Sequence, residues 1–240
     1  MKINDYFSVN YDKKNRSKKS IKILVIHYTG MQSERESLKR LTTAASKVSA
    51  HYVINRSGKI FKLVNENNVA WHAGKSKWKN YKNLNKNSIG IELVNKGHQY
   101  GYQKYTKIQI KKLIKLCKYL IKKYRIKKSL ILGHSDIAPL RKMDPGEKFP
   151  WKKLSKSNLG IWYKIEKANL AIKKNDIYKS FFVNLFKIGY RYFNQNKSSY
   201  RDQLIIKAFQ RRYSPEKITG RIDLKLLKIS HFLTKNQKIS

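Results

Sequence analysis

The chain has 240 residues, with 55 Lys or Arg against 14 Asp or Glu, which gives a formal net charge of +41. This length suits one large domain or two modest ones. Such a charge would attract nucleic acid, anionic cell-wall polymers or lipid headgroups. The basic residues are spread along the whole sequence, however, which favours ordinary solvated side chains. The single cysteine, Cys117, excludes an intramolecular disulfide and a structural zinc site closed by thiolates.

Residues 1–20 are polar and basic, and we predict that they form a basic, mobile N-terminal arm. The first residues lack the apolar core of a secretory signal, and no run reaches the roughly 18 apolar residues of a membrane span. The sequence as written therefore predicts a cytoplasmic protein without a transmembrane segment. A location in the periplasm or cell envelope is the alternative.

The first predicted strand is the apolar, β-branched run 21–26, which ends at His27. Gly30 follows this histidine and permits a turn. The segment 33–48 then carries leucine and alanine at helical spacing, which predicts a helix after the first histidine.

A hairpin is predicted next, from strands at 51–55 and 59–64 joined by Arg56-Ser57-Gly58. His51 begins the first of these strands and is a candidate for substrate contact. Its position in an alternating strand is equally compatible with a packed histidine.

Two further segments carry candidate site residues. Trp71 and His72 fall between strands, and the indole face suits the apolar side of a sugar ring. Trp71 as part of the core is the alternative. The segment 88–94 predicts a strand in which Glu92 stands alone among apolar neighbours. A buried carboxylate is costly unless it is paired or functional, so Glu92 is a candidate catalytic residue.

A long amphipathic helix is predicted from Thr106, which has capping-box spacing to Gln109, to Tyr124. Its apolar face should lie on the sheet. Strands that alternate with helices predict an α/β fold, with a mixed central sheet flanked by helices and a site at the strand ends.

The short apolar strand 129–132 leads to His134, and Asp144 follows ten residues later, just before Pro145. With His27, these residues make two neutral histidines and one carboxylate. That set leaves an open fourth position in a tetrahedral zinc site, as is typical of catalytic rather than structural zinc. The alternative is that His134 caps a strand and Asp144 starts a turn.

The pattern changes after residue 163. We predict a linker at 164–175 and a helical domain at 176–240, with helices at 176–193, 202–213 and 224–233.

Six sequence blocks occur in the order typical of one enzyme family. They are VIHYT (25–29), SAHYVINRSGKI (49–60), AWHAG (70–74), NSIGIELVN (87–95), GHSDIAP (133–139) and KMDPG (142–146). With them, the segment 21–163 resembles the catalytic domain of the zinc-dependent N-acetylmuramoyl-L-alanine amidases of type 2, whose fold is related to that of peptidoglycan recognition proteins. The run 208–212 and the turn 219–223 resemble the small three-helix peptidoglycan-binding domain. A helical addition that serves packing or dimerisation is the alternative for this region.

The resemblance implies hydrolysis of the amide between N-acetylmuramic acid, intact or 1,6-anhydro, and L-alanine, in cell-wall turnover or recycling. It implies Zn²⁺ as cofactor, with His27, His134 and Asp144 as its ligands. It also implies substrate contacts at Trp71, His72 and, with less support, His51.

Glu92 would handle the protons of the reaction, because one carboxylate can serve as base and then as acid. The lysozyme-like branch of the family uses a tyrosine at the position that Ala50 occupies here, which favours the glutamate-using branch.

Lys142 lies two residues before Asp144 on a loop predicted to be extended, so its ammonium should face the metal. The family pattern places a lysine there, and we expect Lys142 to stabilise the oxyanion. Arg141 should point away. The alternative is that Lys142 is one more surface lysine.

Two other functions remain as alternatives: a non-catalytic peptidoglycan-recognition protein, and a basic nucleic-acid-binding protein that rests on charge alone. We expect a peptidoglycan or muropeptide partner, no nucleic acid, and a monomer.

Overall fold

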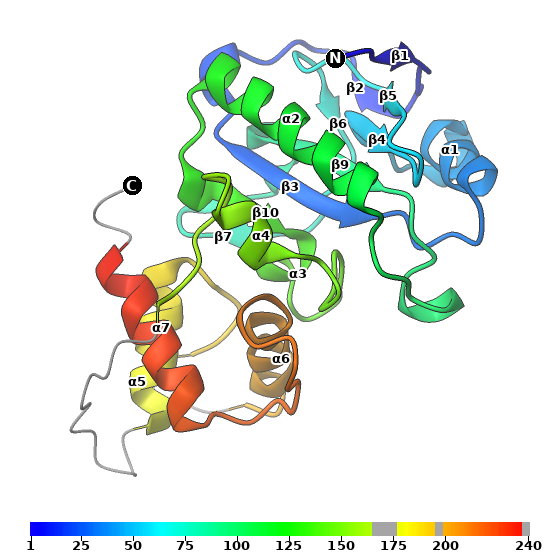
Figure 1. The fold of residues 1–240 in the computed structure, drawn as a ribbon. Coiled ribbons are helices and arrows are strands. Elements are labelled where there is room, and N and C mark those ends of the chain that lie inside the picture. The colour runs from blue at the N-terminus through cyan, green and yellow to red at the C-terminus, as the bar shows by residue number, and fades with distance from the viewer. Residues whose placement is uncertain (165–176, 195–198, 237–240) are drawn as a thin grey trace.

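The computed structural model describes residues 1–164, 177–194 and 199–236. It is built around a six-stranded mixed sheet (Figure 1). Its strands stand in the order β1-β5-β4-β9-β3-β10. β4 and β5 pair antiparallel as the predicted hairpin, and the other neighbours pair parallel. The bounds are β1 Asn4–Asp5, β3 Ile23–Tyr28, β4 Tyr52–Ile54, β5 Ile60–Lys62, β9 Ser88–Leu93 and β10 Ile131–Gly133.

The part of the chain that the structure describes also holds two small antiparallel ribbons, seven α-helices and five short 3-10 helices. The ribbons pair β2 (Tyr11–Asp12) with β6 (Val69–Ala70), and β7 (Lys77–Trp78) with β8 (Tyr81–Lys82). The helices are α1 Glu34–Thr42, α2 Lys107–Tyr124, α3 His134–Ile137, α4 Trp151–Ser155, α5 Ile177–Ile188, α6 Asp202–Tyr213 and α7 Leu224–Asn236. The predicted fold class is confirmed. No described helix is both long and apolar enough to cross a membrane.

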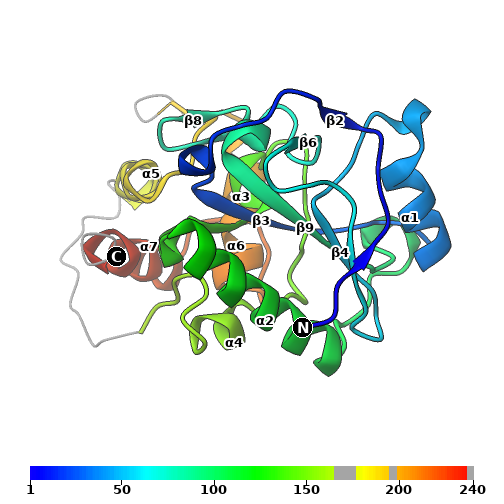
Figure 2. The ribbon, with the colours of Figure 1, turned by 90° about the horizontal axis from the view of Figure 1, so that it is seen from above.

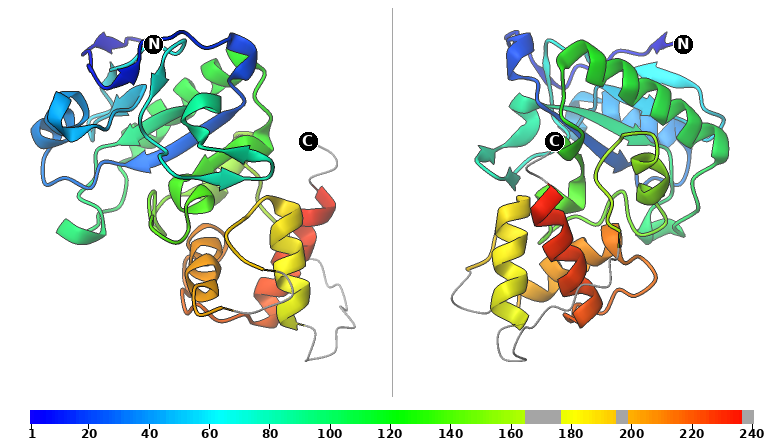
Figure 3. Two further views of the ribbon diagram at one scale, coloured as in Figure 1. Left: turned by 180° about the vertical axis from the view of Figure 1, so that it is seen from behind. Right: turned by 60° about the vertical axis from the view of Figure 1, so that its left-hand side comes forward.

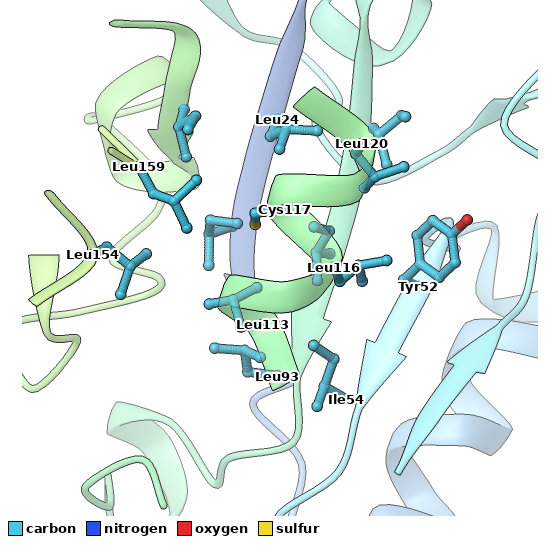
Figure 4. Close-up of a cluster of buried hydrophobic side chains, with 14 of the residues drawn as sticks. Leu24, Tyr52, Ile54, Leu93, Leu113, Leu116, Cys117, Leu120, Leu154 and Leu159 are labelled. Carbon is cyan, nitrogen blue, oxygen red and sulfur yellow. The ribbon is translucent and has the colours of Figure 1, made fainter. Parts of the chain in front are cut away.

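One face of the sheet packs against α2 (Figure 4). Leu24 on β3 points to this side, where it joins buried leucines on α2 such as Leu113 and Leu120. Cys117 lies in the same cluster and is fully buried, and burial raises the pKa of its thiol to about 12. The helix begins where predicted, because the Thr106 side chain accepts a hydrogen bond from the Gln109 N–H.

The opposite face of β3 shares its core with the C-terminal helices. Ile23 and Val25 belong to one buried cluster with Phe181 of α5, Phe209 of α6 and Leu227 of α7. Figure 3 shows these three helices packed together beside the sheet-containing part. The helical region is therefore joined to the sheet by a continuous apolar core, which fits the packing alternative for this region.

The predicted helix 176–193 is shorter in the structure and ends at Ile188. Gly189 follows with φ +140°, and a side chain there would collide with the Trp78 ring. The chain can therefore turn sharply at this point and bring Tyr190 into the core. Except for Lys164, the predicted linker lies outside the described residues.

The prediction of a mobile N-terminal arm was wrong. β1 extends the main sheet beside β5, and Ser8 is buried, where its hydroxyl donates to the Leu41 carbonyl. Arg16 donates to backbone carbonyls that include Glu66 and Ser88. In Figure 2 this segment runs along the outside of the sheet. Polar side chains of this segment form hydrogen bonds to backbone groups elsewhere in the fold. The hydrophobicity pattern of the sequence does not predict such bonds.

Candidate active site

The carboxyl ends of neighbouring parallel strands bring the predicted metal ligands together. His27 is near the end of β3, and His134 follows β10 as the first residue of α3. β3 and β10 are paired neighbours in the sheet (Figure 1). Asp144 lies on the loop after α3, which is closed by a 2.8 Å hydrogen bond from the Ser135 N–H to the Asp144 carbonyl. Ligands commonly bind in the crevice beyond the carboxyl ends of parallel strands.

The three side chains are buried and converge on one point. His27 Nδ1 lies 2.9 Å from Asp144 Oδ2, His134 Nδ1 lies 3.1 Å from the same oxygen, and the two Nδ1 atoms are 3.0 Å apart. Among the described residues this is the one cluster of histidine and acidic side chains suited to hold a metal ion. The trio predicted from the sequence is therefore assembled in the fold.

A chain of hydrogen bonds behind His27 sets its tautomer. The Ser88 hydroxyl donates to the Leu84 carbonyl at 2.5 Å, so its oxygen accepts from His72 Nε2–H at 3.2 Å. His72 Nδ1 is then an acceptor for His27 Nε2–H at 3.1 Å. His27 Nδ1 is thereby left as a lone pair directed at the ligand cluster.

His134 has the same tautomer for a different reason. Its Nε2–H donates to the Ala73 carbonyl at 3.1 Å, which leaves Nδ1 as a lone pair facing Asp144. Metal-bound histidines commonly donate their second N–H to a carbonyl or carboxylate in this way.

Three electron pairs therefore meet at the centre of the cluster, and this arrangement is stable only with a proton or cation between them. Their separations are close to the roughly 3.4 Å expected for tetrahedral ligands with bonds of about 2.1 Å. The donor set and its geometry fit a zinc ion.

The pKa shifts of the ligands favour the forms that bind cations. Burial alone would raise the pKa of Asp144, but the neighbouring imidazoles of His134 and His27 hold it well below its usual range. Burial lowers the pKa of His27 to about 4, helped by the nearby His134. At neutral pH the aspartate is thus ionised and His27 is neutral.

Glu92 lies beside this cluster on the adjacent strand, where it pairs in register with His27. Its carboxyl is buried, and Oε2 has no hydrogen-bond partner among the described residues. Burial and the negative charge of Asp144 raise the pKa of Glu92 to about 8, and Lys142 opposes this shift. A buried, unpaired carboxyl facing a cleft is poised to exchange protons with a bound molecule.

Lys142 stands over the same space. Its ammonium makes no hydrogen bond or ion pair with a described residue, and its charge lowers the pKa values of both Glu92 and His27. That the ammonium faces the metal stays a prediction.

All of these groups line one cleft of about 350 Å³. Its floor holds the three ligands and Glu92, and its walls come from α1, the loop after β3, the loop after β9 and the loop after α3. The lining residues include Tyr28, Ser37, Arg40, Trp71, His98 and Met143.

A model of the N-acetylmuramoyl-L-alanine amidase family matches residues 17–147, more than half of the chain. The chain belongs to this amidase family. N-acetylmuramoyl-L-alanine amidase AmiD of Escherichia coli is 42% identical over 152 residues, which are 58% of this chain and 54% of AmiD. The 1,6-anhydro-N-acetylmuramyl-L-alanine amidase AmpD of Haemophilus influenzae is 42% identical over 108 residues, 45% of this chain and 56% of AmpD. The amidase-family chain thus spans about half the length of the curated relatives it matches.

Two solved amidase structures share the architecture over nearly the whole chain. Escherichia coli AmiD, in complex with anhydro-N-acetylmuramic acid-L-Ala-D-γ-Glu-L-Lys, has a TM-score of 0.78 and 31% identity and covers 93% of this chain and 91% of its own. AmpDh3 from Pseudomonas aeruginosa, in complex with an anhydromuramic pentapeptide, has a TM-score of 0.81 and 31% identity. That match covers 95% of this chain and 97% of AmpDh3. The C-terminal helices are included in both likenesses.

The structure separates the three predicted substrate residues of this amidase-family chain. Trp71 lines the cleft, where its indole N–H donates to Asp12. His72 also borders the cleft, but both its ring nitrogens are engaged by His27 and Ser88, so it orients a ligand.

The prediction of substrate contact at His51 was wrong. Its ring is fully buried away from the cleft, and Nδ1 accepts from the Gly90 N–H at 3.1 Å. Burial and the charge of Arg16 lower the pKa of this histidine to about 3. His51 is therefore a histidine packed in the core, which was the alternative to substrate contact.

The side chain of Arg141 lies in a different place from the one predicted. It was expected to point away from the site, but it lines the cleft and donates to the Ala73 and Lys75 carbonyls. Because the Ala73 carbonyl also accepts from His134, Arg141 helps to fix the position of this ligand. The prediction failed because hydrogen bonds to backbone carbonyls overrode the alternation of an extended chain.

A second support comes from the C-terminal helices. Arg212 of α6 donates to Asp136 of α3, two residues after His134, and both side chains are buried. Tyr190 donates to the other oxygen of Asp136 at 2.6 Å, and Asp136 accepts from the Gly133 N–H at 2.8 Å. The short helix that carries His134 is thus held from the C-terminal region.

Proposed function

We propose that this amidase-family chain catalyses zinc-dependent hydrolysis of the amide between N-acetylmuramic acid, intact or 1,6-anhydro, and L-alanine in peptidoglycan or muropeptides. The observation that carries the proposal is the convergence of three ligand lone pairs beside Glu92 and Lys142 in one cleft. A zinc ion held by His27, His134 and Asp144 would supply a Lewis acid that activates water near neutral pH. The anhydromuropeptides bound to AmiD and AmpDh3 support the substrate class.

Glu92 serves as the proton carrier in this proposal. Its ionised form takes a proton from the attacking water, and its protonated form passes that proton to the departing amine of L-alanine. The pKa of about 8 lets the carboxyl occupy both forms near neutral pH. A cation at the three ligands would favour the ionised form that the first step needs.

Lys142 stabilises the charge that develops on the substrate. Attack on the amide turns its carbonyl oxygen into an oxyanion, and a fixed ammonium interacts more strongly with that oxyanion than with the neutral carbonyl. Trp71, half-buried on the cleft wall, offers a face for the sugar ring.

The filled ligand set favours an enzyme over a non-catalytic recognition protein, which has no need of a complete metal site. Nucleic-acid binding rests on net charge alone. The expected cytoplasmic location and monomeric state stay predictions, which fractionation of native cells and light scattering would test.

The metal requirement is tested by measuring zinc in the purified protein together with its amidase activity. We expect near-stoichiometric zinc, loss of activity on chelation and recovery when zinc is restored. Full activity in protein stripped of metal would rule out the proposed mechanism.

Replacing Lys142 by Ala should lower kcat by roughly 100-fold or more, as for loss of a single oxyanion donor elsewhere, with zinc content retained. The steady-state rate on a soluble muropeptide measures this effect. Lys39→Ala on α1 is the matched control, because Lys39 is an exposed lysine outside the cleft. Arg141→Ala is unsuitable as a control, since Arg141 holds the Ala73 carbonyl. Equal rates for Lys142→Ala and Lys39→Ala would show that Lys142 has no catalytic role.

A further inference from the structure

A second concave site lies between the β7–β8 ribbon and the segment that follows α5. This basic groove has a volume of about 680 Å³ and is lined by Lys77, Lys79, Tyr81, Lys82, Arg191, Tyr192, Phe193, Asn194, Ser199, Tyr200 and Arg201. Figure 2 shows β8 beside the segment after α5. The two walls come from segments that are more than 100 residues apart in the sequence, so the groove forms only when the chain is folded.

The composition of the basic groove is unlike that of the surface in general. Five of its eleven lining residues are cationic, against 55 of 240 in the whole chain, and none is acidic. Four others are aromatic. Burial and the neighbouring charges of Lys127 and Arg191 lower the pKa of Lys79, which shows that cations are crowded here. An anionic ligand would relieve that repulsion.

The β7–β8 ribbon is held against residues 189–192 by several contacts. The Lys79 N–H donates to the Gly189 carbonyl at 2.8 Å, and the Trp78 and Tyr190 rings pack edge-to-face at 4.9 Å. Lys77 lies over the Tyr192 ring at 5.3 Å. Tyr192 has φ +78°, an unfavourable conformation for a bulky residue, and its buried hydroxyl has no hydrogen-bond partner among the described residues. Strained residues of this kind persist where the surroundings over-determine them, often at binding sites.

Arg141 links the catalytic cleft to the chain segment that leads into one wall of the basic groove. Arg141 lines the cleft and is near enough to Tyr192 of the groove for the two side chains to influence each other's pKa. Arg141 also donates to the Lys75 carbonyl, two residues before the ribbon begins. A polymer bound across the cleft could therefore extend over Arg141 into the groove.

We propose that the basic groove is an accessory binding site for polymeric peptidoglycan, which rests on the function proposed above. Its cations would pair with stem-peptide carboxylates, and its tyrosines would pack against sugar rings. The site raises the efficiency of the enzyme on the polymer and leaves its action on a single muropeptide unchanged, because a short substrate fills the cleft alone.

The test compares two triple variants with equal loss of charge. The groove variant is Lys77→Gln, Lys79→Asn and Lys82→Gln, with asparagine chosen because it tolerates the positive φ of Lys79. The control variant is Lys39→Gln, Lys111→Gln and Lys118→Gln, which alters exposed lysines on α1 and α2. A second groove variant, Tyr200→Ala, removes a side chain that is 80% exposed and whose loss should not disturb folding.

The readouts are kcat/KM on purified sacculi and on a soluble muropeptide, with binding of duplex DNA measured beside them. We expect the groove triple to lose about tenfold on sacculi, Tyr200→Ala to lose activity in the same direction, and both to match wild type on the muropeptide. Equal losses in the groove and control triples, or no loss in either, would overturn the proposal. If the groove triple kept its activity on sacculi but lost affinity for DNA, the proposal would also be overturned, and nucleic acid would be the ligand of the groove. Failure of the proposed function itself is distinct, since wild type would then leave the muropeptide uncut.

Discussion

Replacing Glu92 by Gln is expected to lower kcat roughly 10²- to 10⁴-fold, the usual contribution of a general acid–base group, while zinc content stays the same. Glutamine keeps the size of the side chain but cannot carry a proton from water to the leaving amine. Because Glu92 is not among the three clustered ligands, the metal site should be unaffected. Single-turnover kinetics on a muropeptide, with zinc analysis of the same preparation, measures both quantities.

Glu66 offers a matched control for this substitution. It is also a buried carboxylate, but Tyr52, Lys123 and Tyr124 all donate to it, far from the cleft. Glu66→Gln should reduce stability and leave kcat near that of wild type. If Glu92→Gln retained the kcat of Glu66→Gln, the proton-carrying role would belong to another group.

The same Glu92 variant should also change how stability depends on pH. Burial raises the folded-state pKa of Glu92 from 4.5 to about 8, so the folded state holds its proton over that range while the unfolded chain releases it. The contribution of Glu92 to the free energy of unfolding is therefore fully present below pH 4.5 and is lost as pH rises through 8. At about 1.4 kcal/mol per pKa unit, the loss reaches up to about 5 kcal/mol.

In metal-free protein, Glu92→Gln should thus gain thermal stability relative to wild type as pH rises from 5 to 9. Thermal melts of the two chelated proteins across this range measure the difference. A constant difference at all pH values would mean that Glu92 titrates normally in the fold.

Replacing Arg212 by Met should destabilise the protein by about 3–5 kcal/mol, because Asp136 would be left as a buried charge without its partner. Arg212 also donates to the Ile131 carbonyl at 3.1 Å and lies 4.0 Å from the centre of the Trp151 ring. Since Asp136 belongs to the short helix that begins with His134, we expect weaker zinc binding as well.

Urea unfolding of the metal-free protein measures the loss of stability in Arg212→Met, and zinc titration measures the weaker zinc binding. Asp136→Asn combined with Arg212→Met should recover part of the loss, because the uncompensated charge is gone. Arg35→Met on α1 removes an exposed arginine and should change stability by no more than about 0.5 kcal/mol. If Arg212→Met were as mild as this control, the C-terminal helices would not support the metal site.

The sequence was sufficient to predict the residues that lie at strand ends. His27, His134 and Glu92 each follow or occupy a short apolar run, and parallel strands bring such positions to one edge of a sheet. The partners that orient them were not predictable, because they depend on contacts between distant segments. The Arg212–Asp136 pair spans 76 positions, and the contact of Arg141 with Ala73 spans 68.

His51 and His72 show the limit of pattern reading most clearly. Each lies in a block shared with the amidases, and the blocks alone do not show which histidine lies at the cleft. In the structure the His72 ring packs against Gly90, where any side chain would collide with the imidazole that supports His27. His51 lies behind this ring, at 5.6 Å between ring centroids, and does not reach the cleft.

The most direct test of the proposed function is mass spectrometry of the products formed from an N-acetylmuramoyl tripeptide. We expect two products, the free sugar acid and a tripeptide whose new amino terminus is L-alanine, with formation stopped by chelation and restored by zinc. An intact substrate, or cleavage at a bond within the peptide or the sugar, would contradict it.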